Sequence, residues 1–484
     1  MSFHHTEKLP PDVSIDQKTG KKIWSVGTLR YTQGGLLVLF GWLMFNDFFL
    51  MLMEQIKPNL TGILIRSHGA TNTEIALYLG TLGSLFTFWI NPLASTWSDR
   101  TRTKWGRRRP FLLICTPPMV IIMGLIPWMP DIWNWFSHLP FVAQFCTPGS
   151  ARGAVAAIGF CYVVSGVFNN FILAIFTLFF IDVVPKSVMG RFNAILRIVT
   201  MIQQFIWNYW VFGLAEHNMK WIYGGLAGAC AVCYIVSLIM VKEGEYPPPE
   251  PIAPGVEKPA WHVRIFGPVA TYVKECYLNP YYVWVFLAFL VYQGSNVANT
   301  FRLFHWKETL GFSMDTIGKM QAWPQLGIVI IGYLLGTMVD KFKSLRMMPI
   351  ALGLWACVNV ASFFFLRTPT TMLIFMGLIT LCHFLFSISW GVMNVEIYPR
   401  AKMGQFCSAQ TLSATVFVML LNLVVGPFFD WVDNYQFAYA WSAVWQFAAV
   451  FLFIKVYRNW KKKTAEDARL AAAGVPGLPS DMKS

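Results

Sequence analysis

The chain has 484 residues, of which 56% are hydrophobic and only 13% are charged, whereas about 25% of the residues in typical soluble domains are charged. Its net charge of +14 does not indicate a nucleic-acid partner, because the basic residues lie in short segments between apolar runs and form no basic face interleaved with aromatic residues. The composition therefore excludes a soluble domain and predicts a protein whose surroundings are the lipid bilayer.

Apolar runs of about 20 residues recur along the whole chain, and a helix of that length crosses a hydrocarbon core of roughly 30 Å. We predict an all-α integral membrane fold with twelve transmembrane helices and both termini in the cytoplasm, because 29 of the 38 lysine and arginine residues then face the cytoplasm. The predicted spans are 33–56, 74–97, 111–128, 154–183, 192–215, 221–241, 280–301, 316–339, 346–366, 371–397, 407–430 and 437–457.

A charged, proline-rich stretch, KEGEYPPPEPIAPGVEKPAW, separates the sixth and seventh spans and cannot continue a helix. The halves on either side carry matching residues: IDVVPKSVMGRF ends the fourth span and VEIYPRAKMGQF the tenth, with Asp182 and Glu396 at the same place. Such a parallel repeat predicts two pseudo-symmetric six-helix bundles. The predicted organisation is a cytoplasmic tail 1–32, a bundle 33–241, a cytoplasmic linker 242–279, a bundle 280–457 and a cytoplasmic tail 458–484.

The loop after the second span reads SDRTRTKWGRRRPF and follows a span that contains Asn91-Pro92. This motif resembles the glycoside-pentoside-hexuronide cation symporters of the major facilitator superfamily, the branch that holds melibiose permease, and it also resembles the sucrose transporters. The resemblance implies the major facilitator fold and a secondary transporter that moves a sugar or glycoside by alternating access.

The resemblance also aligns the second span with that of its sodium-coupled members, where D-x-x-x-D-P holds the cation. The two aspartates correspond here to Thr87 and Asn91, and without a carboxylate the site lacks the charge that offsets dehydration of sodium. We therefore expect no melibiose-type sodium site, no metal and no cofactor, and symport coupled to protons. Asn169 stands where the family has a sugar-contacting carboxylate, whereas Asp47 looks like the counterpart of the family's first-span aspartate.

Charged residues at the cytoplasmic ends of the spans form a candidate gate. An aspartate at the end of one helix can pair with arginines of a neighbouring loop, and opening to the cytoplasm must break those contacts. The alternative is that these residues only orient the chain in the membrane. The candidates are Asp99, Arg100, Arg107, Arg108, Asp182, Arg191, Asp340 and Glu396.

Charged groups inside the spans are costly, at least ~2.5 kcal/mol each at the membrane centre, so each one is a functional hypothesis. The candidates for proton coupling are Asp47, Glu54, Arg197 and His383. Arg197 would be the counter-charge of Asp47. Glu54, two turns after Asp47, suits either a proton path or an interfacial anchor, and His383 suits either a proton relay or helix packing.

Amide side chains match the donors and acceptors of sugar hydroxyls, and aromatic faces cover the C–H surface of a pyranose ring. Interhelical hydrogen bonding is the alternative use of such residues. The candidates for binding a small-molecule sugar are Asn46, Asp47, Asn169, Asn170, Gln203, Gln204, Trp207, Gln293, Asn296 and Trp390.

Other functions remain open on the same fold. The missing pair of carboxylates also permits an uncoupled sugar facilitator, and the substrate can instead be another small organic solute or a lipid. No Walker loop, HExxH motif or nucleophile elbow occurs in the sequence, and a membrane-embedded acyltransferase would need clustered His and Asp at one membrane face. We therefore expect a monomeric transporter in the plasma membrane, or in the inner membrane of a bacterium, and not an enzyme.

Overall fold

The computed structural model describes residues 12–16, 21–144, 147–244, 276–399 and 402–472. Most of the predicted linker 242–279 lies outside the described residues. The chain packs as two compact units. The first consists of Met1–Pro254, Ser313–Ala322 and Asn422–Val432, and the second of Gly255–Phe312, Trp323–Leu421 and Asp433–Ser484.

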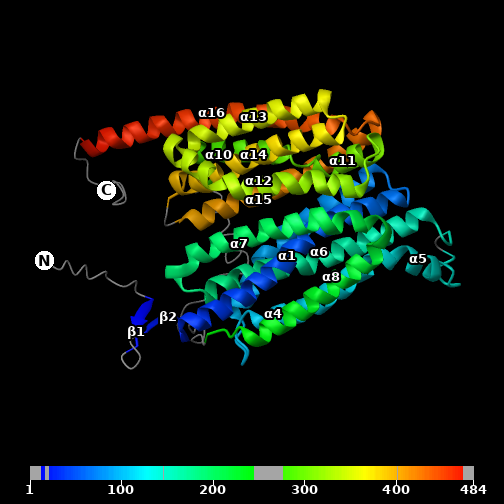
Figure 1. Cartoon of the computed structure of the whole chain (residues 1–484), viewed down its shortest axis with the longest axis horizontal. Coiled ribbons are helices and arrows are strands. Elements are labelled where there is room, and N and C mark those ends of the chain that lie inside the picture. The colour runs from blue at the N-terminus through cyan, green and yellow to red at the C-terminus, as the bar shows by residue number, and fades with distance from the viewer. Residues whose placement is uncertain (1–11, 17–20, 145–146, 245–275, 400–401, 473–484) are drawn as a thin grey trace, which may run out of the picture. The chain divides into compact units, whose positions relative to one another are not determined.

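The first unit is a bundle of long helices preceded by a small antiparallel sheet (Figure 1). In it α6 packs against α3 and α4, and α1 packs against α7 and α8. Its elements are β1 (Val13–Ile15), β2 (Lys22–Val26), β3 (Leu29–Tyr31), α1 (Gln33–Ser67), α2 (Asn72–Ile75), η1 (Ala76–Thr81), α3 (Leu82–Arg100), α4 (Arg109–Leu125), η2 (Ile126–Trp128), α5 (Met129–Ser137), α6 (Ala151–Val183), α7 (Lys186–Ile206), η3 (Trp207–Val211) and α8 (Phe212–Met240).

The second unit is also a helix bundle, in which α13 packs against α14 and α16, and α10 packs against α16. The first residues of α12 and the last residues of α15 belong to the first unit. The elements of the second unit are α10 (Pro280–Gly294), α11 (Asn299–Phe304), η4 (His305–Thr309), α12 (Met314–Phe342), α13 (Ser344–Phe365), α14 (Pro369–Ile397), α15 (Met403–Val432) and α16 (Phe437–Ala472).

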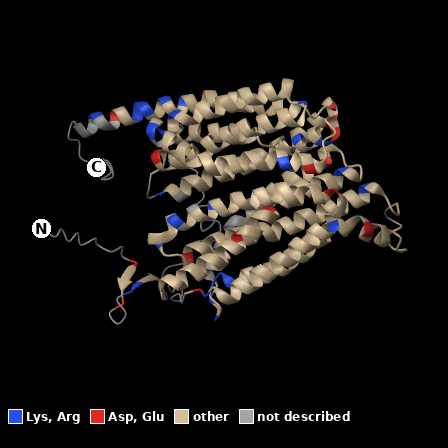
Figure 2. Ribbon diagram, viewed as in Figure 1, with Lys and Arg blue, Asp and Glu red and all other residues tan. Residues whose placement is uncertain are grey.

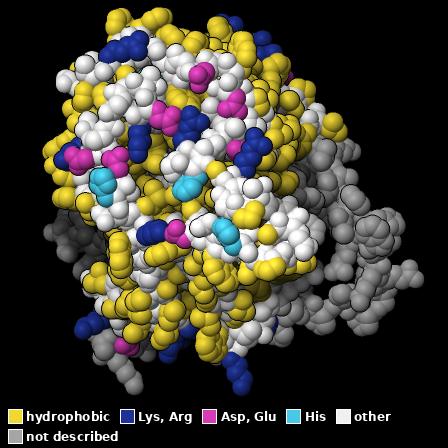
Figure 3. Space-filling view, turned by 90° about the vertical axis from the view of Figure 1, so that its right-hand side faces the viewer, with side chains coloured by type: hydrophobic (Ala, Val, Ile, Leu, Met, Phe, Trp, Pro, Cys, Tyr) yellow, Lys and Arg dark blue, Asp and Glu magenta, His cyan; other side chains and the backbone are white. Residues whose placement is uncertain are grey.

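Within the described residues, nine helices are long and apolar enough to cross a membrane, and one of them covers both the fifth and the sixth predicted span. Most of the charged residues lie near the helix ends, and the middle stretches of the helices carry few of them (Figure 2). On the face drawn in Figure 3, acidic and basic side chains lie interspersed rather than in a patch of one sign. This is the pattern of a multi-pass membrane protein.

Helix α1 extends beyond the predicted span 33–56 and ends only at Ser67. Lys57, which the prediction leaves outside the membrane, lies within the helix and is only 8% exposed. The apolar pattern resumes after Pro58 as NLTGILI, so one charged residue and one proline do not end the helix.

The seventh predicted span, 280–301, is interrupted in the structure between Gly294 and Asn299, where α10 ends and α11 begins. Two backbone carbonyls near the break are satisfied by α16. The indole N–H of Trp441 donates to the carbonyl of Gly294 at 3.0 Å, and the hydroxyl of Ser442 donates to that of Ser295 at 2.8 Å. A break in a membrane helix is stable only when neighbouring groups bind the freed backbone in this way.

The sheet occupies part of the segment predicted as a tail. Strands β1, β2 and β3 form an antiparallel meander, in which Trp24 pairs with Val13 and Tyr31. The carboxylate of Asp12, just before β1, accepts a hydrogen bond of 2.9 Å from the backbone N–H of Ser187 in the first turn of α7. Burial alone would raise the pKa of Asp12, but the hydrogen bonds from Ser187 outweigh it, so the pKa lies below 3.8.

Candidate functional site

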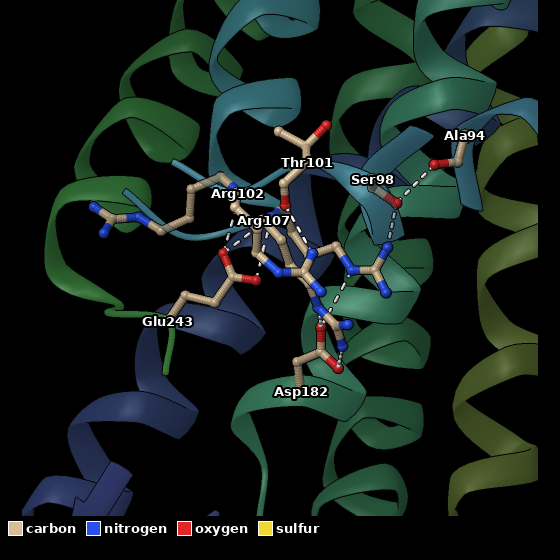
Figure 4. Close-up of polar contacts among 9 residues, drawn as sticks. Ala94, Ser98, Thr101, Arg102, Arg107, Asp182 and Glu243 are labelled. Carbon is tan, nitrogen blue, oxygen red and sulfur yellow. Dashed lines mark hydrogen bonds and ion pairs between the residues drawn. The ribbon is translucent and has the colours of Figure 1, made fainter. Parts of the chain in front are cut away.

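Two arginines of the loop before α4 share the carboxylate of Asp182 near the end of α6 (Figure 4). Arg107 binds it in a bidentate manner, with Nη2 at 2.7 Å from Oδ1 and Nε at 3.1 Å from Oδ2. Arg108 donates from Nε to Oδ2 at 3.2 Å and from Nη1 to the hydroxyl of Ser98 on α3. The side chain of Arg108 is only 3% exposed and that of Asp182 is 12% exposed, so the ion pair that links these three elements is largely shielded from water.

The carboxylate of Glu243, just after α8, approaches the same loop (Figure 4). It accepts hydrogen bonds from the backbone N–H groups of Arg108 at 3.0 Å and Arg109 at 3.4 Å, where α4 begins. Burial raises the pKa of Glu243 above its usual value, and these N–H donors oppose the rise. We call Ser98, Arg107, Arg108, Asp182 and Glu243 the inner cluster.

The structure thus brings three of the predicted gate residues, Arg107, Arg108 and Asp182, into direct contact. Arg191 is exposed on α7, and within the described residues no ion pair joins it to Asp182. Glu243 was not predicted, because its sequence context, KEGEY, reads only as the start of the linker.

The other predicted gate residues on α3, α12 and α14 lie at or near the ends of these helices. Asp99 and Arg100 lie at the end of α3 and Asp340 near the end of α12, but their side chains are outside those described. Glu396, near the end of α14, is exposed and accepts a hydrogen bond of 3.0 Å from the hydroxyl of Ser344 at the start of α13. The helix that bears this carboxylate and the helix that it contacts correspond, in the repeat, to α6 and α4 of the first unit.

A polar group inside the first unit joins α1 to α6. Asn169 donates its amide N–H to the carboxylate of Glu54. The buried ammonium of Lys57 interacts electrostatically with Glu54 and lies 4.9 Å from the centre of the Tyr162 ring. Sequence reasoning missed Lys57, although its position one turn after Glu54 on the same helix was a signal that could have revealed it.

Asp47 and Arg197, the two predicted deep charges, interact electrostatically. The side-chain amide of Asn170 on α6 donates to the hydroxyl of Thr87 on α3 at 2.7 Å, a contact between two neutral side chains.

Several buried polar atoms of the first unit have no hydrogen-bond partner within the described residues. Gln203 on α7 is 0% exposed, and neither polar atom of its amide is bonded; the carbonyl oxygen of Asn46 and the indole nitrogen of Trp207 are likewise unbonded. An unsatisfied buried polar group costs about 1–3 kcal/mol, so such groups point to places where a polar molecule binds. Gln204, next to Gln203, is half-buried.

In the second unit, Gln293 and Asn296 lie at the break in the seventh span, and Trp390 and His383 lie on α14. Asn296 lies within the break and donates to the side-chain oxygen of Gln293 at 3.2 Å. Trp390 on α14 stacks on Phe289 of α10 with 4.2 Å between ring centres. His383 is exposed on α14, and its ring lies edge-on to Trp355 at 5.3 Å.

A second buried cation was also missed. Arg302 on α11, which the predicted span 280–301 leaves outside, is 6% exposed and donates to the side-chain oxygen of Asn359 at 3.1 Å. Its guanidinium lies 4.9 Å from the centre of the Tyr439 ring. The apolar residues that follow it, LFHW, could have indicated that the helical span continues.

A further contact lies within the first unit, at the opposite ends of the helices from the inner cluster. The carboxylate of Asp430, in the part of α15 that belongs to this unit, accepts hydrogen bonds from the backbone N–H groups of Asn72 at 2.8 Å and Thr73 at 3.0 Å. These donors form the start of α2. We call this the outer contact.

Within the described residues, no group of three or more His, Cys, Asp or Glu side chains has an arrangement that could hold a metal ion. No protein-family model and no curated protein matches the sequence.

Solved structures do match the chain. The nucleoside transporter NupG, in a mutant form, aligns with a TM-score of 0.63 at 14% identity over 86% of this chain and 99% of its own. A bacterial homologue of the iron transporter ferroportin in an inward-facing state aligns with a TM-score of 0.60 at 13% identity over 87% and 99%, and a D-xylose-proton symporter with 0.59 at 14% over 86% and 96%. These proteins are transporters of the major facilitator type, and the chain described here is a multi-pass membrane protein with the major facilitator fold.

Proposed function

We propose that the protein is a secondary transporter that moves a sugar or glycoside across the membrane by alternating access, in symport with protons. The observation that carries the proposal is a polar group inside the first unit: the carboxylate of Glu54 on α1 accepts a hydrogen bond from Asn169 on α6, and the buried ammonium of Lys57 lies 4.9 Å from the centre of the Tyr162 ring. Asp47, on the same helix as Glu54, interacts electrostatically with Arg197. Ionisable groups inside membrane helices are retained at a cost, and paired acids and bases of this kind serve as proton sites in transporters.

Protonation of either carboxylate removes its attraction to the neighbouring cation. A cation released in this way favours a different arrangement of the helices, which couples the proton to the conformational change. The inner cluster supplies the element that must open, because Asp182 can release Arg107 and Arg108 only if the loop before α4 moves away from α6.

The sugar class rests on the chemistry of the candidate binding residues. Gln203 and Asn46 offer unbonded amide atoms in the first unit, and Gln293 and Asn296 offer amides at the helix break in the second. Interrupted helices are frequent substrate sites in transporters.

The test is uptake into proteoliposomes that contain the purified protein, with a panel of radiolabelled mono- and disaccharides and an imposed pH gradient. We expect one sugar to accumulate above equilibrium when the outside is acidic. Asp47→Asn should abolish this accumulation, whereas Asp131→Asn, the same chemical change on an exposed residue of α5 that pairs with Lys220, should preserve it. Accumulation that ignores the pH gradient would contradict symport.

An uncoupled sugar facilitator is the second candidate, and one contact favours it. The hydrogen bond between Asn170 and Thr87 joins two neutral side chains of α6 and α3, which supports a mode of transport that uses no cation at this place. A facilitator would equilibrate the same sugar at equal rates with and without the pH gradient, and Asp47→Asn would leave its exchange rate unchanged.

A further inference from the structure

Each unit has a basic pocket at the end predicted to face the cytoplasm. Each pocket lies between the loop after the second span of its half and the end of the last span of its half. The pocket of the first unit has a volume of about 610 Å³, and its charged lining residues are Arg102, Lys104, Arg107, Arg109, Lys242 and Glu243. The pocket of the second unit has a volume of about 540 Å³ and is lined by Lys341, Phe342, Lys343, Arg346, Tyr457, Trp460, Lys461, Thr464 and Ala465.

The first pocket contains its own anion. The carboxylate of Glu243 accepts hydrogen bonds from the backbone N–H groups of Arg108 and Arg109 at the start of α4. Backbone N–H groups at a helix start attract negative charge, and the basic residues around them strengthen that attraction. In the first unit, therefore, a side chain of the protein occupies the place where an anion would bind.

The second pocket has the same surroundings without such a side chain. Among the described residues, its lining holds four basic side chains and no acidic one. The corresponding helix, α13, begins after Lys343 with no side-chain cap on its first N–H groups, as far as the described residues show. Glu396 binds the hydroxyl of Ser344 nearby, but it does not line the pocket. The protein thus concentrates positive charge here and leaves the position of the anion to a ligand.

Aromatic residues and the position along the helices indicate what kind of anion this is. Tyr457 and Trp460 stack with 6.2 Å between ring centres, and the ammonium of Lys343 lies 5.9 Å from the centre of the Trp460 ring. Phe342 is 44% exposed. The pocket lies between the apolar stretch that ends at Val339 and the one that begins at Ser344, which is the level of the lipid headgroups.

We propose that this pocket binds the phosphate of an anionic phospholipid from the cytoplasmic leaflet. Lys343, Arg346 and Lys461 contact the phosphate, and the exposed ring of Phe342 contacts the first methylene groups of the acyl chains. A soluble phosphate would use the basic residues but would gain nothing from an apolar ring at the membrane surface. Clusters of basic residues next to membrane helices recognise anionic lipids in this way.

The test uses the purified full-length protein in detergent and native mass spectrometry with added phosphatidylglycerol or phosphatidylcholine. We expect the wild type to retain one molecule of phosphatidylglycerol and to retain no phosphatidylcholine under the same conditions. The double substitution Lys343→Gln and Lys461→Gln should weaken this binding roughly thirtyfold. The matched control, Lys104→Gln with Lys242→Gln, removes two charges from the pocket that Glu243 already serves, and it should retain the lipid as the wild type does.

Three results would overturn the proposal. Equal retention of both lipids would show that charge plays no part, and equal loss in the control variant would show an effect of total charge alone. Competition by inorganic phosphate at the same concentration as the lipid would show a site for a soluble anion. If the double variant fails to fold, Arg346→Gln alone should still weaken phosphatidylglycerol binding about fivefold.

Discussion

Lys57 is a buried cation that lies on the same helix as Glu54 and interacts with it. The side-chain amide of Asn169 donates to the carboxylate of Glu54, and the ammonium of Lys57 interacts with it electrostatically. Replacing Lys57 by Met keeps the length of the side chain and removes its charge. We expect Lys57→Met to reduce proton-driven sugar accumulation at least tenfold, because loss of about 1.4 kcal/mol from an interaction that differs between two conformations changes their ratio tenfold.

The measurement is initial and steady-state uptake in proteoliposomes with a pH gradient. Lys220→Met is the matched control, because Lys220 pairs with Asp131 on the exposed surface. Unchanged accumulation in Lys57→Met, with normal folding by circular dichroism, would mean that Lys57 only packs against Tyr162 and takes no part in coupling.

At the scale of the helices, the break between α10 and α11 depends on a close approach at Gly294. A Cβ atom at this position would lie 2.8 Å from the indole of Trp445 on α16. Gly294→Ala should therefore push α10 away from α16 and weaken the hydrogen bond from Trp441 to the carbonyl of residue 294. We expect a loss of about 1–3 kcal/mol in the free energy of unfolding, the usual cost of overpacking.

The control is Gly377→Ala in α14, where a Cβ atom would meet nothing within 4 Å. An alanine in place of a glycine within a helix stabilises by roughly 0.5–1 kcal/mol. The denaturant concentration at the midpoint of unfolding in detergent should thus fall for Gly294→Ala and rise for Gly377→Ala. A parallel shift would contradict the close packing at Gly294.

Long apolar runs were sufficient to predict the membrane class and the positions of most helices, because burial in lipid depends on composition over about 20 residues. The C-terminal end of α1 and the break after α10 were not predictable in this way. Lys57 is tolerated inside a helix because Glu54 and Tyr162 lie beside it, and the break is tolerated because Trp441 and Ser442 bind the carbonyls it frees. Tyr162, Trp441 and Ser442 lie on other helices and far away in the sequence, so composition along one helix does not reveal them.

The candidate site shows the same division. The motif SDRTRTKWGRRRPF pointed to Arg107 and Arg108, and the end of the fourth span, IDVVPKSVMGRF, pointed to Asp182. The structure joins all three. Glu243 and Asp430 were not predicted, because each binds backbone N–H groups. Every residue except proline has such a group, so the sequence of a helix does not show which side chain binds its first N–H groups.

A charged contact joins the β-strand meander to the helices, between Asp12 and the start of α7. The pKa of Asp12 is lower in the folded protein than its ordinary 3.8, so the contact stabilises the meander fully above pH 3.8 and is lost as the pH falls through the lower folded value. Asp12→Asn should speed amide hydrogen exchange of β1 and β2 about two- to fivefold at pH 7, the range expected for an exposed charge at a helix start.

Hydrogen exchange followed by mass spectrometry measures this effect segment by segment. Well below pH 3.8 the wild type and the variant should exchange equally once intrinsic rates are corrected, because the carboxyl of the wild type is then protonated in the folded and the unfolded state. A difference in exchange rate between the wild type and Asp12→Asn that persists in acid would mean that the effect does not come from the charge of the carboxylate.

For the whole molecule, the inner cluster and the outer contact hold opposite ends of the first unit. Asp182 binds Arg107 and Arg108, and Asp430 binds the first N–H groups of α2. If the protein alternates between two states, each contact stabilises only the state in which its own end is closed. Weakening one contact should then loosen its own end and tighten the other.

The two variants Asp182→Asn and Asp430→Asn test this reciprocity. Hydrogen exchange should become faster in 101–110 for Asp182→Asn and in 68–75 for Asp430→Asn. In each variant it should become slower at the opposite end, because the closed state there gains population. A shift of about 1.4 kcal/mol in the equilibrium corresponds to a tenfold change in the ratio of the two states. Faster exchange confined to the mutated end, with no slowing at the other, would show that the two contacts act only locally and are not linked by a conformational equilibrium.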